Sequence, residues 1–252
     1  MPRLMPTSDT QIIDIPGPGN FKFSAIRPEN LGATEYTLVT MVIDVTGSVR
    51  DFADELLDCV KSIVGACKKN QRSENLMLRF ITFNETLEEI HGFLPLADID
   101  PNNYDEFFPD GMTALYDASY SGIGATLTYA KNLIDQDFDV NGCIYIVTDG
   151  ADNKSKITPK HIADMMEEAS RNEQIHSLIT VLVGLNDPKS PWTKEVKMEL
   201  DKFKNEGKLT QFVDAGDATP DKLARLGNFV SESISSQSQA LANKTQSQPL
   251  TF

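Results

Sequence analysis

The sequence predicts an α/β fold: a doubly wound, mostly parallel central sheet of about six strands, with helices on both faces and one antiparallel edge strand. Strand-like apolar runs alternate with helical patterns through residues 35–235. The central runs are almost continuously apolar, which is typical of strands covered on both faces. The chain has 252 residues, of which 40% are hydrophobic, so it can bury one large core.

The first half of the chain begins with a loop-rich arm at residues 1–34, where prolines and glycines surround one strand-like piece at 21–26. Residues 36–45 form a β-branched apolar run, which predicts the first central strand. From Val49 to Cys67, apolar side chains recur at helical spacing behind an acidic first turn, which predicts a helix. The remaining elements predicted here are a strand at 76–83, an edge strand within 87–99 and a helix at 113–133.

The second half contains a third central strand at 143–147 and three helix starts. At each start, a hydroxyl residue precedes a proline. This pair predicts the beginning of a helix, because the hydroxyl can cap the helix and proline fits its first position. These pairs are Thr158–Pro159, Ser190–Pro191 and Thr219–Pro220. Further strands are predicted at 178–183 and 209–213, then a terminal helix at 222–236 and a flexible polar tail at 236–252.

Composition excludes several classes of function. The net charge of −14 argues against a nucleic-acid binder and against docking on an anionic membrane. The three cysteines lie in apolar stretches without a C-x-x-C pair, which predicts buried, reduced thiols. Because we find neither a secretory signal pattern nor a run of about 18 apolar residues, we expect a cytoplasmic protein without a membrane span.

Polar residues follow two of the central strands at the sheet edge where ligands bind in such folds. Asp44, Thr46 and Ser48 follow the first strand, and Asp149 follows the third. Thr113 lies between them at the start of a helix. Two carboxylates and three hydroxyls form an all-oxygen set, which suits Mg²⁺, with Mn²⁺ or Ca²⁺ as alternatives.

Other readings of these residues stay open at this point. Ser48 could simply cap the following helix, and Asp110 and Asp117 could be turn or helix residues near the site rather than ligands. Aromatic residues before Thr113 could form a contact rim, but we favour a role in pinning the loop; they are Tyr104, Phe107 and Phe108. Trp192 could anchor a partner, although a hydrophobic staple is favoured. The three histidines share no motif and are interpreted as packing or surface residues.

With these motifs, residues 35–235 resemble a von Willebrand factor type A domain, and the five oxygen-bearing residues resemble its metal-ion-dependent adhesion site (MIDAS). The family pattern is D-x-S-x-S, a later Thr and an Asp after the fourth strand; here Thr46 replaces the usual first Ser. The resemblance implies that the hydroxyls bind Mg²⁺ directly, that the aspartates act largely through water, and that an Asp or Glu of a partner completes the site. It also implies an intracellular adaptor or assembly role, commonly beside AAA+ ATPases or in bacterial stress and tellurium-resistance gene neighbourhoods.

The sequence therefore predicts a non-enzymatic, metal-dependent protein-interaction module. One alternative is a Mg²⁺-dependent hydrolase, such as a phosphatase, that uses the same aspartates. Such phosphatases generally carry a second Asp where this chain has Thr46, which argues against that alternative. The other alternative is a structural subunit with a vestigial site that acts through its termini.

Overall fold

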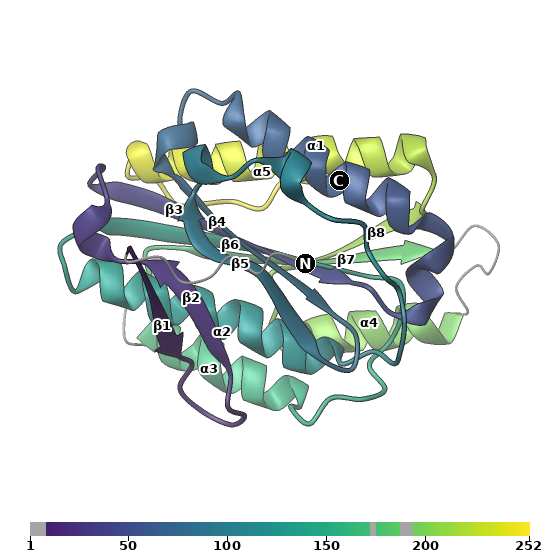
Figure 1. Cartoon of the computed structure of the whole chain (residues 1–252). Helices are drawn as coiled ribbons and strands as arrows, with labels where there is room; N and C mark the ends of the chain where they lie inside the picture. The colour runs from purple at the N-terminus through teal and green to yellow at the C-terminus, as the bar shows by residue number, and fades with distance from the viewer. Residues whose placement is uncertain (1–8, 172–174, 187–193) are drawn as a thin grey trace.

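The computed structural model describes residues 9–171, 175–186 and 194–252 and confirms the predicted α/β fold (Figure 1). Six strands, β3 to β8, form a sheet in the order β5-β4-β3-β6-β7-β8, and only β5 is antiparallel to its neighbour in that set. Two further strands extend it to an eight-stranded sheet. The six strands are β3 Glu35–Asp44, β4 Leu76–Phe83, β5 Leu87–Pro95, β6 Asp139–Thr148, β7 Leu178–Asn186 and β8 Gln211–Asp217.

Helices cover both faces of this sheet. Helices α1 and α5 lie on one face, and α2, α3 and α4 lie on the other (Figure 1). Each face has its own apolar cluster, because the side chains of the buried central strands alternate between the two faces. The helices are α1 Ala53–Lys68, α2 Leu115–Ile134, α3 Pro159–Arg171, α4 Lys194–Glu206 and α5 Pro220–Ala242.

The N-terminal arm contains two strands, whereas the sequence analysis found one. Strands β1 (Thr10–Asp14) and β2 (Lys22–Ile26) form an antiparallel hairpin, and Ala25 of β2 pairs in parallel with Phe93 of β5. Glu89 of β5 helps to hold this hairpin, since its carboxylate accepts hydrogen bonds from both the backbone N–H and the hydroxyl of Ser24. The arm is thus an integral edge of the sheet.

The C-terminal helix continues to Ala242, beyond the end expected at residue 236. After it, the chain returns to the body, where the ring of Phe252 packs edge-on against Phe229 at 5.4 Å and under the guanidinium of Arg225 at 4.6 Å. The predicted helix starts at Pro159 and Pro220 are observed, although Thr219 makes no side-chain cap. Trp192 and the Ser190–Pro191 pair lie outside the described residues.

Among the residues described, no helix combines the length and the apolar character needed to cross a bilayer. The three cysteines are buried and free, as predicted. The chain leaves β3 toward β4 on one side and later returns to β6 on the other side of β3. This reversal creates a switch point at the carboxyl ends of β3 and β6, where an α/β sheet can bind a ligand.

Candidate functional site

The predicted aspartates lie side by side at the switch point. Asp44 is the last residue of β3, and Asp149 directly follows β6. These strands are adjacent and parallel, with Ile43 paired with Val147, so their ends meet at one edge of the sheet. Both aspartates are buried, Asp44 with 1% and Asp149 with 8% of its surface exposed.

Four of the five predicted residues form one chain of short contacts. The hydroxyl of Ser48 donates to Oδ1 of Asp149 at 2.9 Å and lies 3.1 Å from Oγ1 of Thr46. The backbone N–H of Thr46 donates to Oδ1 of Asp44 at 2.8 Å. Residues that are 101 positions apart in the chain are thereby brought into direct contact by the pairing of β3 with β6.

Thr113, the fifth residue, is held beside this cluster by the loop after β6. Its backbone N–H donates to Oδ1 of Asn153 at 2.8 Å, and its carbonyl accepts from the backbone N–H groups of Asn153 and Lys154. The side-chain oxygen of Thr113 lies 3.8 Å from the point where a Cβ on Gly150 would stand. Thr113 is 5% exposed, so its hydroxyl is enclosed next to the segment that carries Asp149.

A second loop also meets the site. The carbonyl of Gly111 accepts from the backbone N–H of Gly47 at 3.4 Å, and the backbone N–H of Asp110 donates to the carbonyl of Val45 at 3.1 Å. Gly111 has a φ of +78°, which is a conformation that favours glycine. These contacts hold the segment before Thr113 against the turn that follows β3.

Asp44 has an unfavourable environment for its charge. Burial raises the pKa of its carboxyl, and hydrogen bonds from Thr148 and Thr46 oppose that rise. The bond from the Thr148 hydroxyl to Oδ2 is 2.6 Å long. Among the ion pairs of the described residues, none includes Asp44, so no basic side chain neutralises it there. A cation at this point would offset the cost of its burial.

The sequence analysis did not single out Thr148 as a site residue. It lies directly before Asp149 and fixes the carboxylate of Asp44, so it is a positioning residue of the cluster. Thr148 directly follows the third predicted central strand, and this position could have marked it as a candidate site residue. Asn153 was also missed, because its contact with Thr113 joins loops 40 residues apart.

The alternative reading of Ser48 as a helix cap is wrong. The 3-10 turn Gly47–Phe52 has Thr46 at its N-cap position without a side-chain cap, and α1 begins later, at Ala53. The Ser48 hydroxyl donates to Asp149 instead. Ser48 is exposed, so the cluster is open to solvent on this side.

The two flanking aspartates differ in their surroundings. Asp117 accepts hydrogen bonds from the backbone N–H groups of Lys156 and Ile157, at 3.0 and 2.8 Å, which ties the loop after β6 to α2. Asp110 is exposed. Asp117, which lies on α2, therefore has a structural role, since it holds the loop beside the cluster in place.

The aromatic loop residues divide into two groups. Tyr104 is buried and donates its hydroxyl hydrogen to Nε2 of His91 at 2.9 Å, because Nδ1 of that ring faces the carbonyl of Gly92. The ring centroids of Tyr104 and Phe107 lie 5.1 and 6.3 Å from that of Phe80. These two residues pin the loop, as predicted, whereas Phe108 is 71% exposed.

The donor set fits a hard divalent cation. It consists of carboxylate and hydroxyl oxygens, the ligands that Mg²⁺ and Ca²⁺ prefer, and it includes a buried carboxylate whose charge lacks a basic partner. In the described part of the chain, no group of three or more His, Cys, Asp or Glu residues is placed to hold a metal ion. A site here therefore depends on hydroxyl ligands as well as carboxylates.

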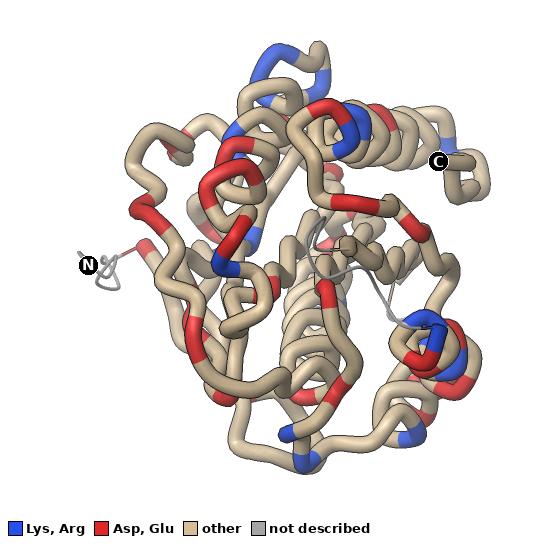
Figure 2. The backbone as a smooth tube through the Cα atoms, turned by 90° about the vertical axis from the view of Figure 1, so that its right-hand side faces the viewer, with Lys and Arg blue, Asp and Glu red and all other residues tan. Residues whose placement is uncertain are grey.

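The surroundings of the cluster are acidic. Figure 2 views the molecule from the right-hand side of Figure 1, toward the carboxyl ends of the parallel strands, and shows Asp and Glu spread over many of the loops there. This agrees with the net charge of −14. Such a surface attracts cations and basic partners.

Fold and cluster together define an α/β domain with an oxygen-lined site at its switch point. Neither protein-family models nor curated proteins match the chain. Solved structures do match. Proximal thread matrix protein 1 (PTMP1) from the mussel byssus is 17% identical, with a TM-score of 0.51 over 80% of this chain and 47% of that chain. The D319A mutant of the PilB minor pilin from Streptococcus sanguinis is 12% identical, with a TM-score of 0.55 over 87% of this chain and 66% of that one.

A third match is the pilus adhesin SpaC from Lactobacillus rhamnosus GG in an open conformation, 11% identical, with a TM-score of 0.52 over 91% of this chain and 34% of that one. PTMP1 is also among the matches as a structure with a zinc-occupied MIDAS motif. The chain spans less than half the length of the PTMP1 chains it matches. These similarities show a von Willebrand factor type A-like fold.

Proposed function

We propose that this chain is a non-enzymatic protein-interaction module that binds a divalent cation, Mg²⁺ first, and through it a carboxylate of a protein partner. The metal would be held by Asp44, Thr46, Ser48, Thr113 and Asp149. One observation carries the proposal: the hydrogen-bonded cluster of oxygen side chains from the ends of β3 and β6, open to solvent at Ser48. PTMP1, whose structure is known with a zinc-occupied MIDAS motif, supports the choice of a metal site.

The chemistry of the donors supports capture of a partner carboxylate. Hydroxyl ligands are neutral, so the bound cation keeps much of its charge and gains from an additional anionic ligand. The buried Asp44 carboxylate is fixed by Thr46 and Thr148 and would orient the site, directly or through water. The proposed partner therefore presents an exposed Asp or Glu.

The proposed setting of the module follows from the sequence resemblance. We propose a cytoplasmic adaptor or assembly protein, whose partner would be an AAA+ ATPase or a protein of a bacterial stress operon of the tellurium-resistance kind. Three buried free thiols and an acidic surface agree with that setting. Adhesion and matrix proteins among the structural matches favour an interaction role over catalysis.

Metal binding is tested by thermal unfolding with and without Mg²⁺. At a concentration of 100 times Kd, a ligand that binds only the folded state raises the free energy of unfolding by about 2.7 kcal/mol. For a domain of this size, that gain raises Tm by about 5–11 °C. We expect this shift in the wild type and its loss in Asp44→Asn and Ser48→Ala. Asp54→Asn is the matched control, because Asp54 is an exposed aspartate in the first turn of α1.

The Asp44→Asn variant should fold. Burial disfavours the charged carboxylate, so a neutral amide of the same shape should leave the metal-free protein as stable as the wild type or more stable. A shift of equal size in the wild type and in both site variants would contradict the metal assignment. Partner capture is then tested by pull-down in Mg²⁺ and in EDTA, where a partner retained in EDTA and by Asp44→Asn would contradict metal-bridged binding.

A further inference from the structure

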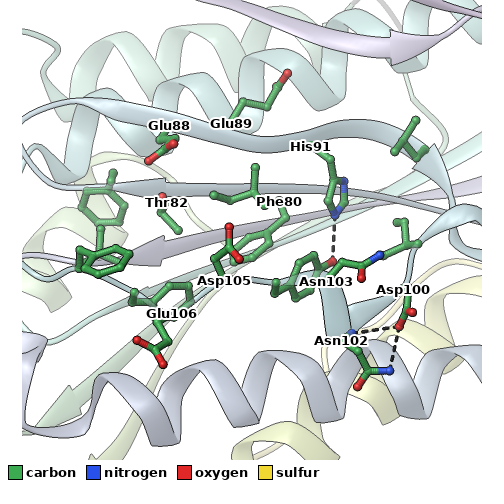
Figure 3. Close-up of a pocket in the computed structure, with 18 of the residues that line it drawn as sticks. Phe80, Thr82, Glu88, Glu89, His91, Asp100, Asn102, Asn103, Asp105 and Glu106 are labelled. Carbon is green, nitrogen blue, oxygen red and sulfur yellow. Dashed lines mark hydrogen bonds between the residues drawn. The ribbon is translucent and has the colours of Figure 1, made fainter. Parts of the chain in front are cut away.

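A pocket of about 770 Å³ lies next to the cluster and has no part in the proposed metal site. Strands β4 and β5 form one wall, and the loop from Asp98 to Phe108 forms the other (Figure 3). Its near end reaches Val45 and Asn84, which follow the carboxyl ends of β3 and β4. A ligand group in this pocket would therefore lie beside the proposed cation.

The charged residues that line the pocket are acidic. Among the described residues, six acidic ones line it and no Lys or Arg does. The histidine in this set, His91, is buried, and burial lowers its pKa. Glu89 pairs with Arg79, but the other five acidic residues form none of the ion pairs of the described chain. Those five are Glu88, Asp98, Asp100, Asp105 and Glu106.

Two of these carboxylates frame the interior. Asp105 extends from the loop toward β5, and Glu88 lies on the side of β5 that faces the loop, whereas Glu89 points to the opposite side (Figure 3). Phe107 and Phe108 also line the pocket, and Phe107 is half-buried while Phe108 is 71% exposed. The pocket thus combines carboxylates with exposed ring faces.

No basic side chain of the described residues fills this pocket. The nearby basic residues Lys68 and Arg50 donate to backbone carbonyls, those of Ile99 and Pro109. A metal ion is also disfavoured, since no group of three acidic or other metal-binding side chains converges within the described residues. The complementary occupant is an organic cation with a flat apolar face.

We propose that this pocket binds the side chain of an arginine carried by the protein partner. A guanidinium is planar, so it can form paired hydrogen bonds with a carboxylate such as Glu88 or Asp105 and stack on an aromatic ring such as Phe108. The pocket itself needs no metal. The further statement that this arginine and the metal-bound carboxylate belong to one partner rests on the proposed function.

The first test is a titration of the ¹⁵N-labelled protein with Nα-acetyl-arginine N-methylamide in EDTA, followed by backbone NMR shifts. We expect saturable shifts at residues of the pocket, such as Thr82 and Phe107. The citrulline compound, which replaces the guanidinium with a neutral urea, should bind at least 10-fold more weakly. Equal binding of the two compounds, or shifts without any focus on the pocket, would overturn the proposal.

Variants assign the carboxylates. Glu88→Gln combined with Asp105→Asn should weaken arginine binding at least 10-fold, whereas a control with the same charge change on the surface, Glu74→Gln combined with Asp58→Asn, should not. Asp44→Asn should also bind the arginine compound normally, which separates this proposal from that of the metal site. Tighter binding of spermidine than of the arginine compound would overturn the assignment to a side chain and indicate a free polyamine.

The shared partner is tested with peptides in which an aspartate and an arginine are separated by zero to three glycines. In Mg²⁺, one spacing should bind at least 10-fold more tightly than the arginine compound, and EDTA should remove this gain. If the arginine compound binds but no spacing shows a gain, the single-partner statement is overturned. If a gain persists in EDTA, the metal contact is overturned and the pocket stands.

Discussion

The ion pair between Arg79 of β4 and Glu89 of β5 contributes to the stability of the fold, and its contacts indicate how much stability is lost when Glu89 is removed. Nε of Arg79 lies 2.8 Å from Oε2 of Glu89, and the two side chains are 2% and 24% exposed. The other carboxylate oxygen of Glu89 accepts from the backbone N–H and hydroxyl of Ser24, at 2.9 and 2.7 Å. Glu89 thus joins the arm to the central sheet.

We predict that Glu89→Ala lowers the free energy of unfolding by about 3 kcal/mol. The variant leaves the Arg79 guanidinium with two long hydrogen bonds, at 3.4 Å, to the carbonyl and hydroxyl of Ser121, and with its position over the Phe23 ring, 5.8 Å from the ring centroid. Removing one partner of a buried ion pair costs about 3–5 kcal/mol, and the partial exposure of Glu89 places this case at the lower end. At about 2–4 °C per kcal/mol, Tm should fall by about 6–12 °C.

The assay is urea unfolding followed by circular dichroism, with a thermal scan alongside. Glu88→Ala is the matched control, since Glu88 is an exposed neighbour and should change the free energy of unfolding by less than about 0.5 kcal/mol. The double variant Arg79→Met/Glu89→Leu removes both charges and should recover most of the loss. A loss below about 1 kcal/mol for Glu89→Ala, or a double variant as unstable as the single one, would show that the uncompensated charge of Arg79 is not the cause of the destabilisation.

Three further predictions concern stability and reactivity. Gly92→Ala should detach the arm, because a Cβ there would stand 1.8 Å from the backbone oxygen of Ser24; faster proteolysis of the arm would show this, and wild-type resistance would contradict it. Burial lowers the pKa of His91 below its ordinary value of 6.5. The stability that this neutral ring contributes is therefore present above pH 6.5 and is lost as the pH falls. His91→Gln should accordingly flatten the dependence of Tm on pH between 7 and 5. Burial raises the pKa of both Cys59 and Cys67 to about 12, so a thiol reagent at pH 8 should modify them only on unfolding, and fast modification of the native protein would count against their burial.

Much of the fold could be predicted because its signals are local. A buried parallel strand such as β3 is a continuous apolar run, and α1 shows its apolar stripe at helical spacing. Most of the candidate site could also be predicted, since Asp44, Thr46, Ser48 and Asp149 lie at or just after the ends of two such strands. The carboxyl ends of parallel strands meet at one edge of the sheet. The identity of the five oxygen-bearing residues came from this reasoning and from the family resemblance.

Contacts between distant segments could not be predicted from the sequence. The short arm strand β1 is polar at several positions and gains its place from pairing with β2, while Ser24 reaches Glu89 across 65 residues. The pocket likewise needs both β5 and the loop that returns across it. No local pattern encodes these approaches, because each depends on how separate elements pack.

The α/β class, the succession of the central elements along the chain and the positions of Asp44 and Asp149 at strand ends all follow from the amino-acid sequence, because hydrophobic periodicity and element order are properties of the chain. Packing in three dimensions brings Ser48 to Asp149 instead of a helix-capping position, and it places Thr148 against Asp44. Packing also gathers carboxylates outside any ion pair of the described residues around a neighbouring pocket. These features escape prediction from the sequence because a hydrogen bond or a charge environment depends on distance in space. A side chain's partners are set by packing, not by its neighbours in sequence.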